Sequence, residues 1–158
     1  MKKVAYSPVW SFWAPPLIWT LVLLVLSGNL GSLTNTAGPF KWVVSRLFTL
    51  DPDTLDLLHF YFRKTVHVIF YGILGVLWFR ALMASYPEHF GVNWMLALTL
   101  CLTVALADEE HQYFLPSRTG SWRDVGLDLS GGVLFLFLIA CYWKWKNRLL
   151  VEVKSPSP

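Results

Sequence analysis

Four long apolar stretches constrain this chain more than any other feature of its sequence. The first runs from Val4 to Phe40 without a charged residue, and three more cover Thr65–Phe79, Phe90–Ala107 and Val125–Trp143. An α-helix needs roughly 20 residues to span the hydrocarbon of a bilayer, and each stretch provides or approaches that length. Hydrophobic residues make up 55% of the 158 residues, which excludes an ordinary soluble domain.

We therefore expect one all-α domain over residues 1–158, an integral membrane four-helix bundle. Its helices are expected at about 9–30, 60–82, 92–112 and 122–145. A signal peptide is the alternative for the first stretch, since Lys2 and Lys3 precede an apolar core. No A-x-A cleavage signature follows that core, which favours a retained first span.

Lys and Arg residues set the expected sidedness. With four spans, both termini and the connection near Arg80 share one side, which also holds Lys2, Lys3 and the basic residues of segment 144–154. The other side holds Lys41 and Arg46, together with basic residues of a polar cluster. Acidic partners would hold those cluster residues in place whichever way the protein is oriented in the membrane. The positive-inside rule then predicts that both termini are cytoplasmic.

The segment between the first two spans allows two interpretations. Asp51-Pro52-Asp53 has the form of an N-cap followed by Pro at the first helical position, so a helix is expected to restart there. Residues 52–62 could form an interfacial helix or extend the second span beyond the bilayer.

Polar and ionisable residues recur at one depth in three of the predicted spans. Measured along each helix from its expected cytoplasmic end, these residues lie about 20–24 Å toward the outer side of the membrane. On each helix they share an arc of about 80–100°, so we expect them to face a common interior. Because charge at membrane depth is costly, such a cluster indicates function. It comprises Lys64, His67 and Tyr71 in the second span, Asp108, Glu109 and Gln112 in the third, Asp124 and Asp128 in the fourth, and Arg118 and Arg123 between the last two.

These motifs resemble the signature of the VanZ-like membrane proteins. The resemblance covers roughly residues 59–140. It consists of Lys64-x-x-His67-x-x-x-Tyr71, Asp108-Glu109-x-x-Gln112, Pro116-x-Arg118, and Asp124 followed by Gly131. It implies a multi-pass protein of the bacterial cytoplasmic membrane, with a possible link to resistance against the glycopeptide teicoplanin. One departure is Asp128, where the family pattern leads us to expect Asn.

Three hypotheses follow for the polar cluster. Lys64, Arg118 and Arg123 suit a phosphate, with Tyr71, Gln112, Asp124 and Asp128 completing a binding site for an anionic lipid or a lipid-linked envelope precursor. Alternatively, His67 beside Asp108 or Glu109 could act as a general base in a membrane-embedded phosphoryl-transfer or hydrolase enzyme. In the third hypothesis the charges are buried ion pairs that specify packing, and the chain is an accessory subunit of a membrane complex.

Other partners are not expected from the sequence. Glu110 and His111, with His67 and Asp108, might suggest a metal, but no two His residues have i, i+4 spacing and helical phase turns Glu110 away. We therefore expect no metal and no cofactor. The net charge of +3 arises from Lys and Arg residues predicted to be cytoplasmic, and it gives no reason to expect that the protein binds nucleic acid.

Overall fold

The computed structural model describes residues 10–116 and 120–154, with side chains described up to Lys146. Its regular structure there is entirely helical, in the order α1 (Trp10–Ser27), the 3-10 helix η1 (Asn29–Gly31), α2 (Leu33–Leu47), α3 (Pro52–Ser85), α4 (Phe90–Tyr113) and α5 (Trp122–Lys154). Four of these helices, α1, α3, α4 and α5, are long and apolar enough to cross a membrane. The all-α prediction with four potential spans is confirmed.

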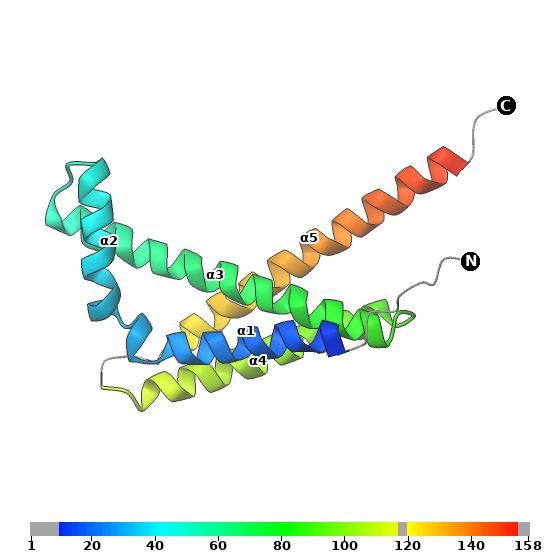
Figure 1. Cartoon of the computed structure of the whole chain (residues 1–158), viewed down its shortest axis with the longest axis horizontal. Coiled ribbons are helices and arrows are strands. Elements are labelled where there is room, and N and C mark those ends of the chain that lie inside the picture. The colour runs from blue at the N-terminus through cyan, green and yellow to red at the C-terminus, as the bar shows by residue number, and fades with distance from the viewer. Residues whose placement is uncertain (1–9, 117–119, 155–158) are drawn as a thin grey trace.

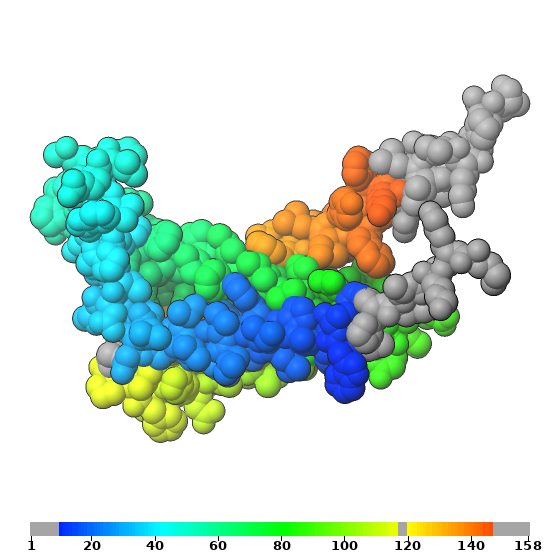
Figure 2. Space-filling view, viewed as in Figure 1, coloured from blue at the N-terminus to red at the C-terminus, as the bar shows by residue number. Residues whose placement is uncertain are grey.

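The four long helices alternate in direction. In Figure 1, α1 starts at the end of the molecule where α3 passes into α4, and α5 runs toward that end while leaning away from the other helices. The α1 helix lies against α3 and α4, and much of the face shown in Figure 2 belongs to it. Two indole hydrogen bonds fix it on α3: Trp19 Nε1 donates to Phe70 O and Trp13 Nε1 donates to Ser85 Oγ, both at 3.0 Å.

Glycines allow α3 and α5 to cross at close range. A Cβ atom on Gly131 would lie 2.9 Å from the carbonyl carbon of Val68, and one on Gly72 would lie 2.5 Å from the ring of Phe135. A Cβ on Gly75 would lie 3.4 Å from the Cα atom of Gly132. Larger residues at this crossing would separate the helices, and with them the polar groups one turn away.

The first turns of α3 pair with α2 at one end of the molecule (Figure 1). The predicted helix start is confirmed: the Asp51 carboxylate accepts hydrogen bonds from Thr54 Oγ1 (2.6 Å) and Thr54 N (3.0 Å), and Pro52 begins the helix. These two bonds, the hydroxyl bond first, lower the pKa of Asp51.

Residues 52–62 are therefore not a separate interfacial helix. They continue without a break into the span, so α3 begins at Pro52 and not near residue 60. The α2 helix was not expected, because Gly38 and Pro39 disfavour a helix interior. Contacts with α3 support it: His59 is buried with its Nε2 3.1 Å from Thr36 Oγ1, and Lys41 pairs with Asp56 at 2.5 Å.

Candidate functional site

The structure brings polar residues of α3, α4 and α5 together beside the α3–α5 crossing. Two of the three helices contribute buried carboxylates, so the cluster lies inside the protein and not on its surface. The buried members are Tyr71, Asp108, Glu109, Gln112 and Asp128; the half-buried members are Lys64, His67 and Asp124.

Two pairs connect α3 to α5. Lys64 Nζ forms an ion pair with Asp124 Oδ1. One turn deeper, His67 Nδ1 lies 3.0 Å from Asp128 Oδ1. The expected neighbour of His67 was Asp108 or Glu109, and this is corrected: the hydrogen-bonding carboxylate is that of Asp128. The spacings of three residues on α3 and four residues on α5 are each about one helical turn, so the two pairs lie in register.

On α4, two carboxylates are each held by one donor. Gln112 Nε2 donates to Asp108 Oδ2 at 3.0 Å, one helical turn away. The backbone N–H of Ser121, at the start of α5, donates to Glu109 Oε2 at 2.6 Å. The Ser121 N–H at the start of α5 is thus bound by Glu109, while the Asp124 carboxylate is engaged by Lys64.

Three carboxylates converge between α4 and α5. One oxygen from each of Asp108, Glu109 and Asp128 lies within 4.8 Å of the other two. Asp108 Oδ1, Glu109 Oε1, Asp128 Oδ2 and the Tyr71 hydroxyl are buried, and no described group forms a hydrogen bond with them. Oxygen ligands of this kind suit hard cations such as Mg²⁺ and Ca²⁺.

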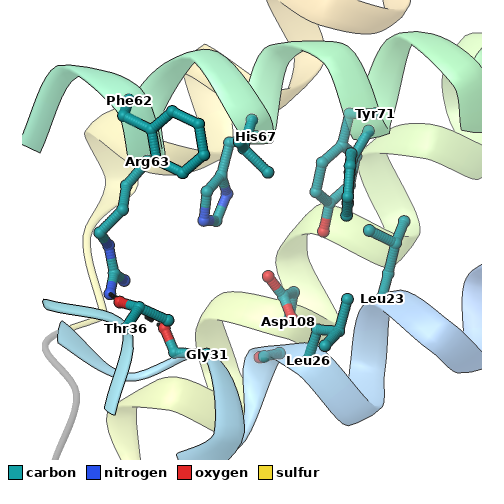
Figure 3. Close-up of a pocket in the computed structure, with 12 residues that line it drawn as sticks. Leu23, Leu26, Gly31, Thr36, Phe62, Arg63, His67, Tyr71 and Asp108 are labelled. Atoms are coloured by element: carbon teal, nitrogen blue, oxygen red, sulfur yellow. Dashed lines mark hydrogen bonds between the residues drawn. The ribbon is translucent and has the colours of Figure 1, made fainter. Parts of the chain in front are cut away.

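A cavity of about 330 Å³ adjoins the cluster between α1, α3 and α4. Figure 3 shows the Tyr71 hydroxyl and Asp108 pointing toward one another across it, with the His67 ring beside them. Apolar side chains from α1 and α3 form much of its wall, among them Leu23, Leu26, Phe62, Val66 and Phe70.

Arg63, a basic residue that the sequence places in the polar cluster but not among the predicted binding residues, lines the cavity. Its Nη1 donates to Gly31 O (2.9 Å) and Thr36 Oγ1 (3.2 Å), which ties α3 to the segment after α1. It lies four residues before His67, and therefore close to it in helical phase. That spacing was the signal that could have identified it.

The structure does not bring every predicted residue into the cluster. Arg123 is exposed at the first turn of α5, where its backbone N–H donates to Ser121 Oγ at 3.3 Å. Glu110 and His111 are exposed on α4. Arg118 lies outside the described residues, and its expected role stays a prediction.

The sequence profile of the VanZ/LLP1 family matches residues 12–144, which covers all four long helices in whole or in large part. No curated protein sequence and no solved structure matches the chain. The match extends beyond residues 59–140, where the motifs were found, and includes α1 and α2. The chain therefore belongs to the VanZ/LLP1 family.

Proposed function

We propose that this protein binds the phosphate-bearing headgroup of an anionic lipid, or of a lipid-linked envelope precursor, in the cavity between α1, α3 and α4. One observation carries the proposal. Three buried polar atoms without a described hydrogen-bond partner belong to residues that line this cavity: Ser27 Oγ, the Tyr71 hydroxyl and Asp108 Oδ1. Because orphan buried polar groups are costly, a headgroup whose phosphate accepts from the two hydroxyls and which presents a donor or a cation to the Asp108 carboxylate would bind favourably.

Charge and shape support a phosphate with an apolar tail. The Arg63 guanidinium and the two hydroxyls of Ser27 and Tyr71 are donors on the cavity wall. The neighbouring wall is apolar, and Leu26 and Phe62 are exposed at 39% and 51%, so an acyl or isoprenoid chain could leave between them. Such ligands belong to a bilayer, and the family resemblance favours the bacterial cytoplasmic membrane.

Native mass spectrometry of the gently purified protein tests this proposal. Wild type is expected to retain a phosphate-bearing lipid, and Arg63→Gln to lose it, because Gln keeps a polar side chain but carries no charge. Arg80→Gln is the matched control, since Arg80 is exposed near the far end of the same helix. Val66→Phe should also lose the lipid, by filling the cavity without changing its charge.

Equal lipid retention by wild type, Arg63→Gln and Val66→Phe would contradict the proposal. The predicted phosphate contacts of Arg118 and Arg123 can be measured in the same way, with alanine variants. We expect Arg123→Ala to have the smaller effect, because its side chain is exposed.

A second candidate function is phosphoryl-group hydrolysis or transfer. It is favoured by the 3.0 Å contact of His67 Nδ1 with Asp128 Oδ1, since a carboxylate at Nδ1 orients the ring and leaves Nε2 available as a general base. His67 also lines the cavity. The test is phosphate release from a phosphorylated lipid: His67→Gln should lower the rate at least a hundredfold. Release by that variant at the wild-type rate would exclude His67 as the base.

The accessory-subunit hypothesis is supported by the Lys64–Asp124 and His67–Asp128 pairs, which join α3 to α5 whether or not a ligand binds. It becomes the preferred function if the purified protein retains no specific lipid and instead co-purifies with a membrane protein partner.

A further inference from the structure

We infer that Asp108, Glu109 and Asp128 form a binding site for one divalent metal ion of the hard class, such as Mg²⁺, Mn²⁺ or Ca²⁺. No spacing in the sequence predicts this site, because its three carboxylates come from two helices, α4 and α5, that only the fold brings together. The inference goes beyond lipid binding and does not depend on it.

The first argument is the distance between the oxygens. One oxygen from each of the three carboxylates lies within 4.8 Å of the other two. Two oxygens bound to the same ion at 2.1–2.4 Å can be at most about 4.2–4.8 Å apart, when they lie on opposite sides of it. The separations are therefore compatible with three ligands of a single ion after small side-chain movements.

The second argument is how each carboxylate is held. In each of them one oxygen has a donor: Gln112 Nε2 for Asp108, Ser121 N for Glu109 and His67 Nδ1 for Asp128. The other oxygen is buried without a described partner. Metal sites are commonly built in this way, with outer donors fixing the carboxylate and one oxygen directed to the ion.

The Tyr71 hydroxyl is a further indication of a ligand beside Asp108. Tyr71 is 1% exposed and its hydroxyl interacts with the Asp108 carboxylate, but no described residue meets it at hydrogen-bond distance and angle. In Figure 3 the hydroxyl points toward Asp108. It belongs to α3 and not to the acidic cluster itself. A water molecule on the ion, or the ion directly, would satisfy it.

The charges of the cluster also favour a bound cation. Lys64 is paired with Asp124, so of the described cations only His67 bonds directly to one of the three carboxylates. Solvent does not screen the repulsion among the three carboxylates, since Asp108, Glu109 and Asp128 are only 3%, 7% and 0% exposed. Three buried like charges would be strongly unfavourable unless one or more of the carboxylates took up a proton or a cation lay among them, and a divalent ion would supply that counter-charge.

Access to the cluster exists from two directions. Asp108 lines the cavity between α1, α3 and α4, and Glu109 lines a second cavity of about 530 Å³ beside the start of α5. An ion in the cluster would thus lie beside the proposed phosphate pocket. Metal ions often bridge carboxylates and phosphate oxygens. A bound ion would therefore offset the repulsion between the Asp108 carboxylate and an anionic ligand.

The test uses Mn²⁺ alone as the probe, with the full-length protein in detergent after treatment with EDTA. Electron paramagnetic resonance of free Mn²⁺ gives the number of ions bound and their dissociation constant. We expect about one Mn²⁺ per chain with a dissociation constant on the order of 0.1 mM or lower, raised at least tenfold in Asp108→Asn. Glu110→Gln, which removes the exposed carboxylate two residues along the same helix, should bind as wild type does.

A second variant distinguishes loss of the metal site from misfolding of the protein. In Glu109→Gln the amide oxygen can still accept from Ser121 N, so the start of α5 keeps its hydrogen bond while the charge is removed. This variant should also lose at least tenfold in affinity, and Mn²⁺ should raise the unfolding temperature of wild type and Glu110→Gln only. The inference is overturned if wild type binds no Mn²⁺ at 1 mM, or if Asp108→Asn and Glu109→Gln bind as well as wild type. No lipid is added, so failure to find a bound lipid would leave this result unaffected.

Discussion

At the scale of residues, Gly131 shows most clearly how one added methyl group can affect the stability of the fold. We predict that Gly131→Ala lowers the free energy of unfolding by about 1–3 kcal/mol, because the new methyl group would overlap the Val68 backbone. Gly126→Ala, on the same helix with no atom within 4 Å of the new Cβ, should be neutral or stabilising by up to about 1 kcal/mol. Thermal unfolding in detergent, followed by circular dichroism, measures both. Similar loss in the two variants would mean that helix propensity, and not the crossing, dominates.

Tyr71 shows how a residue can serve binding at the expense of stability. Its hydroxyl is buried without a described partner, so Tyr71→Phe should leave the ligand-free protein as stable as wild type, or more stable by about 1 kcal/mol. The same variant should weaken binding of Mn²⁺ or of the retained lipid. Unfolding temperature and native mass spectrometry give the two readouts. A marked loss of stability with unchanged binding would assign the hydroxyl a purely structural role.

At the scale of elements, two polar pairs join α5 to α3 beside the glycine crossing. Asp124 on α5 is paired with Lys64 on α3, although Arg123 is its neighbour in sequence. We predict that Lys64→Asp or Asp124→Lys alone costs about 1–3 kcal/mol, less than for a fully buried pair because both side chains are partly exposed. The double variant should recover part of that loss, measured as unfolding temperature. Strictly additive losses would show that the two residues are not coupled.

Much of each element could be predicted from sequence. Hydrophobic length identified all four long helices, and the Asp51-Pro52 cap identified where α3 begins to be helical. The α2 helix could not be predicted, because Gly38 and Pro39 weaken it locally and its support comes from His59, Arg63 and Asp56 on another helix. The Glu109–Ser121 hydrogen bond was equally inaccessible, since it joins α4 to the start of α5 and no local pattern specifies how two helices meet.

At the scale of the whole molecule, the prediction that both termini are cytoplasmic rests on Lys and Arg distribution and calls for direct measurement. Large exposed indoles occur at opposite ends of the helices, with Trp10 81% and Trp122 83% exposed, as expected for anchors in two membrane interfaces. This arrangement is compatible with either orientation of the protein in the membrane.

Single-cysteine labelling measures the orientation. In a background with Cys101→Ala and Cys141→Ser, Thr49→Cys lies in the α2–α3 connection and Glu88→Cys in the α3–α4 connection, both exposed. A membrane-impermeant maleimide should label Thr49→Cys in intact cells and Glu88→Cys only after permeabilisation. The reverse pattern would place both termini outside the cytoplasm.

The sequence by itself determined the four apolar spans and the stripe of polar groups on three of them, because both follow from apolar length and from the fixed rotation per residue. It also placed Lys64, His67, Asp108 and Asp128 in one polar cluster. Only the tertiary structure decided which group meets which: that His67 meets Asp128, that Arg63 enters the cavity and that Arg123 stays outside it. Those outcomes depend on the angle and register at which α5 crosses α3, and these are set by contacts between glycines and distant backbone atoms. No local pattern encodes such contacts.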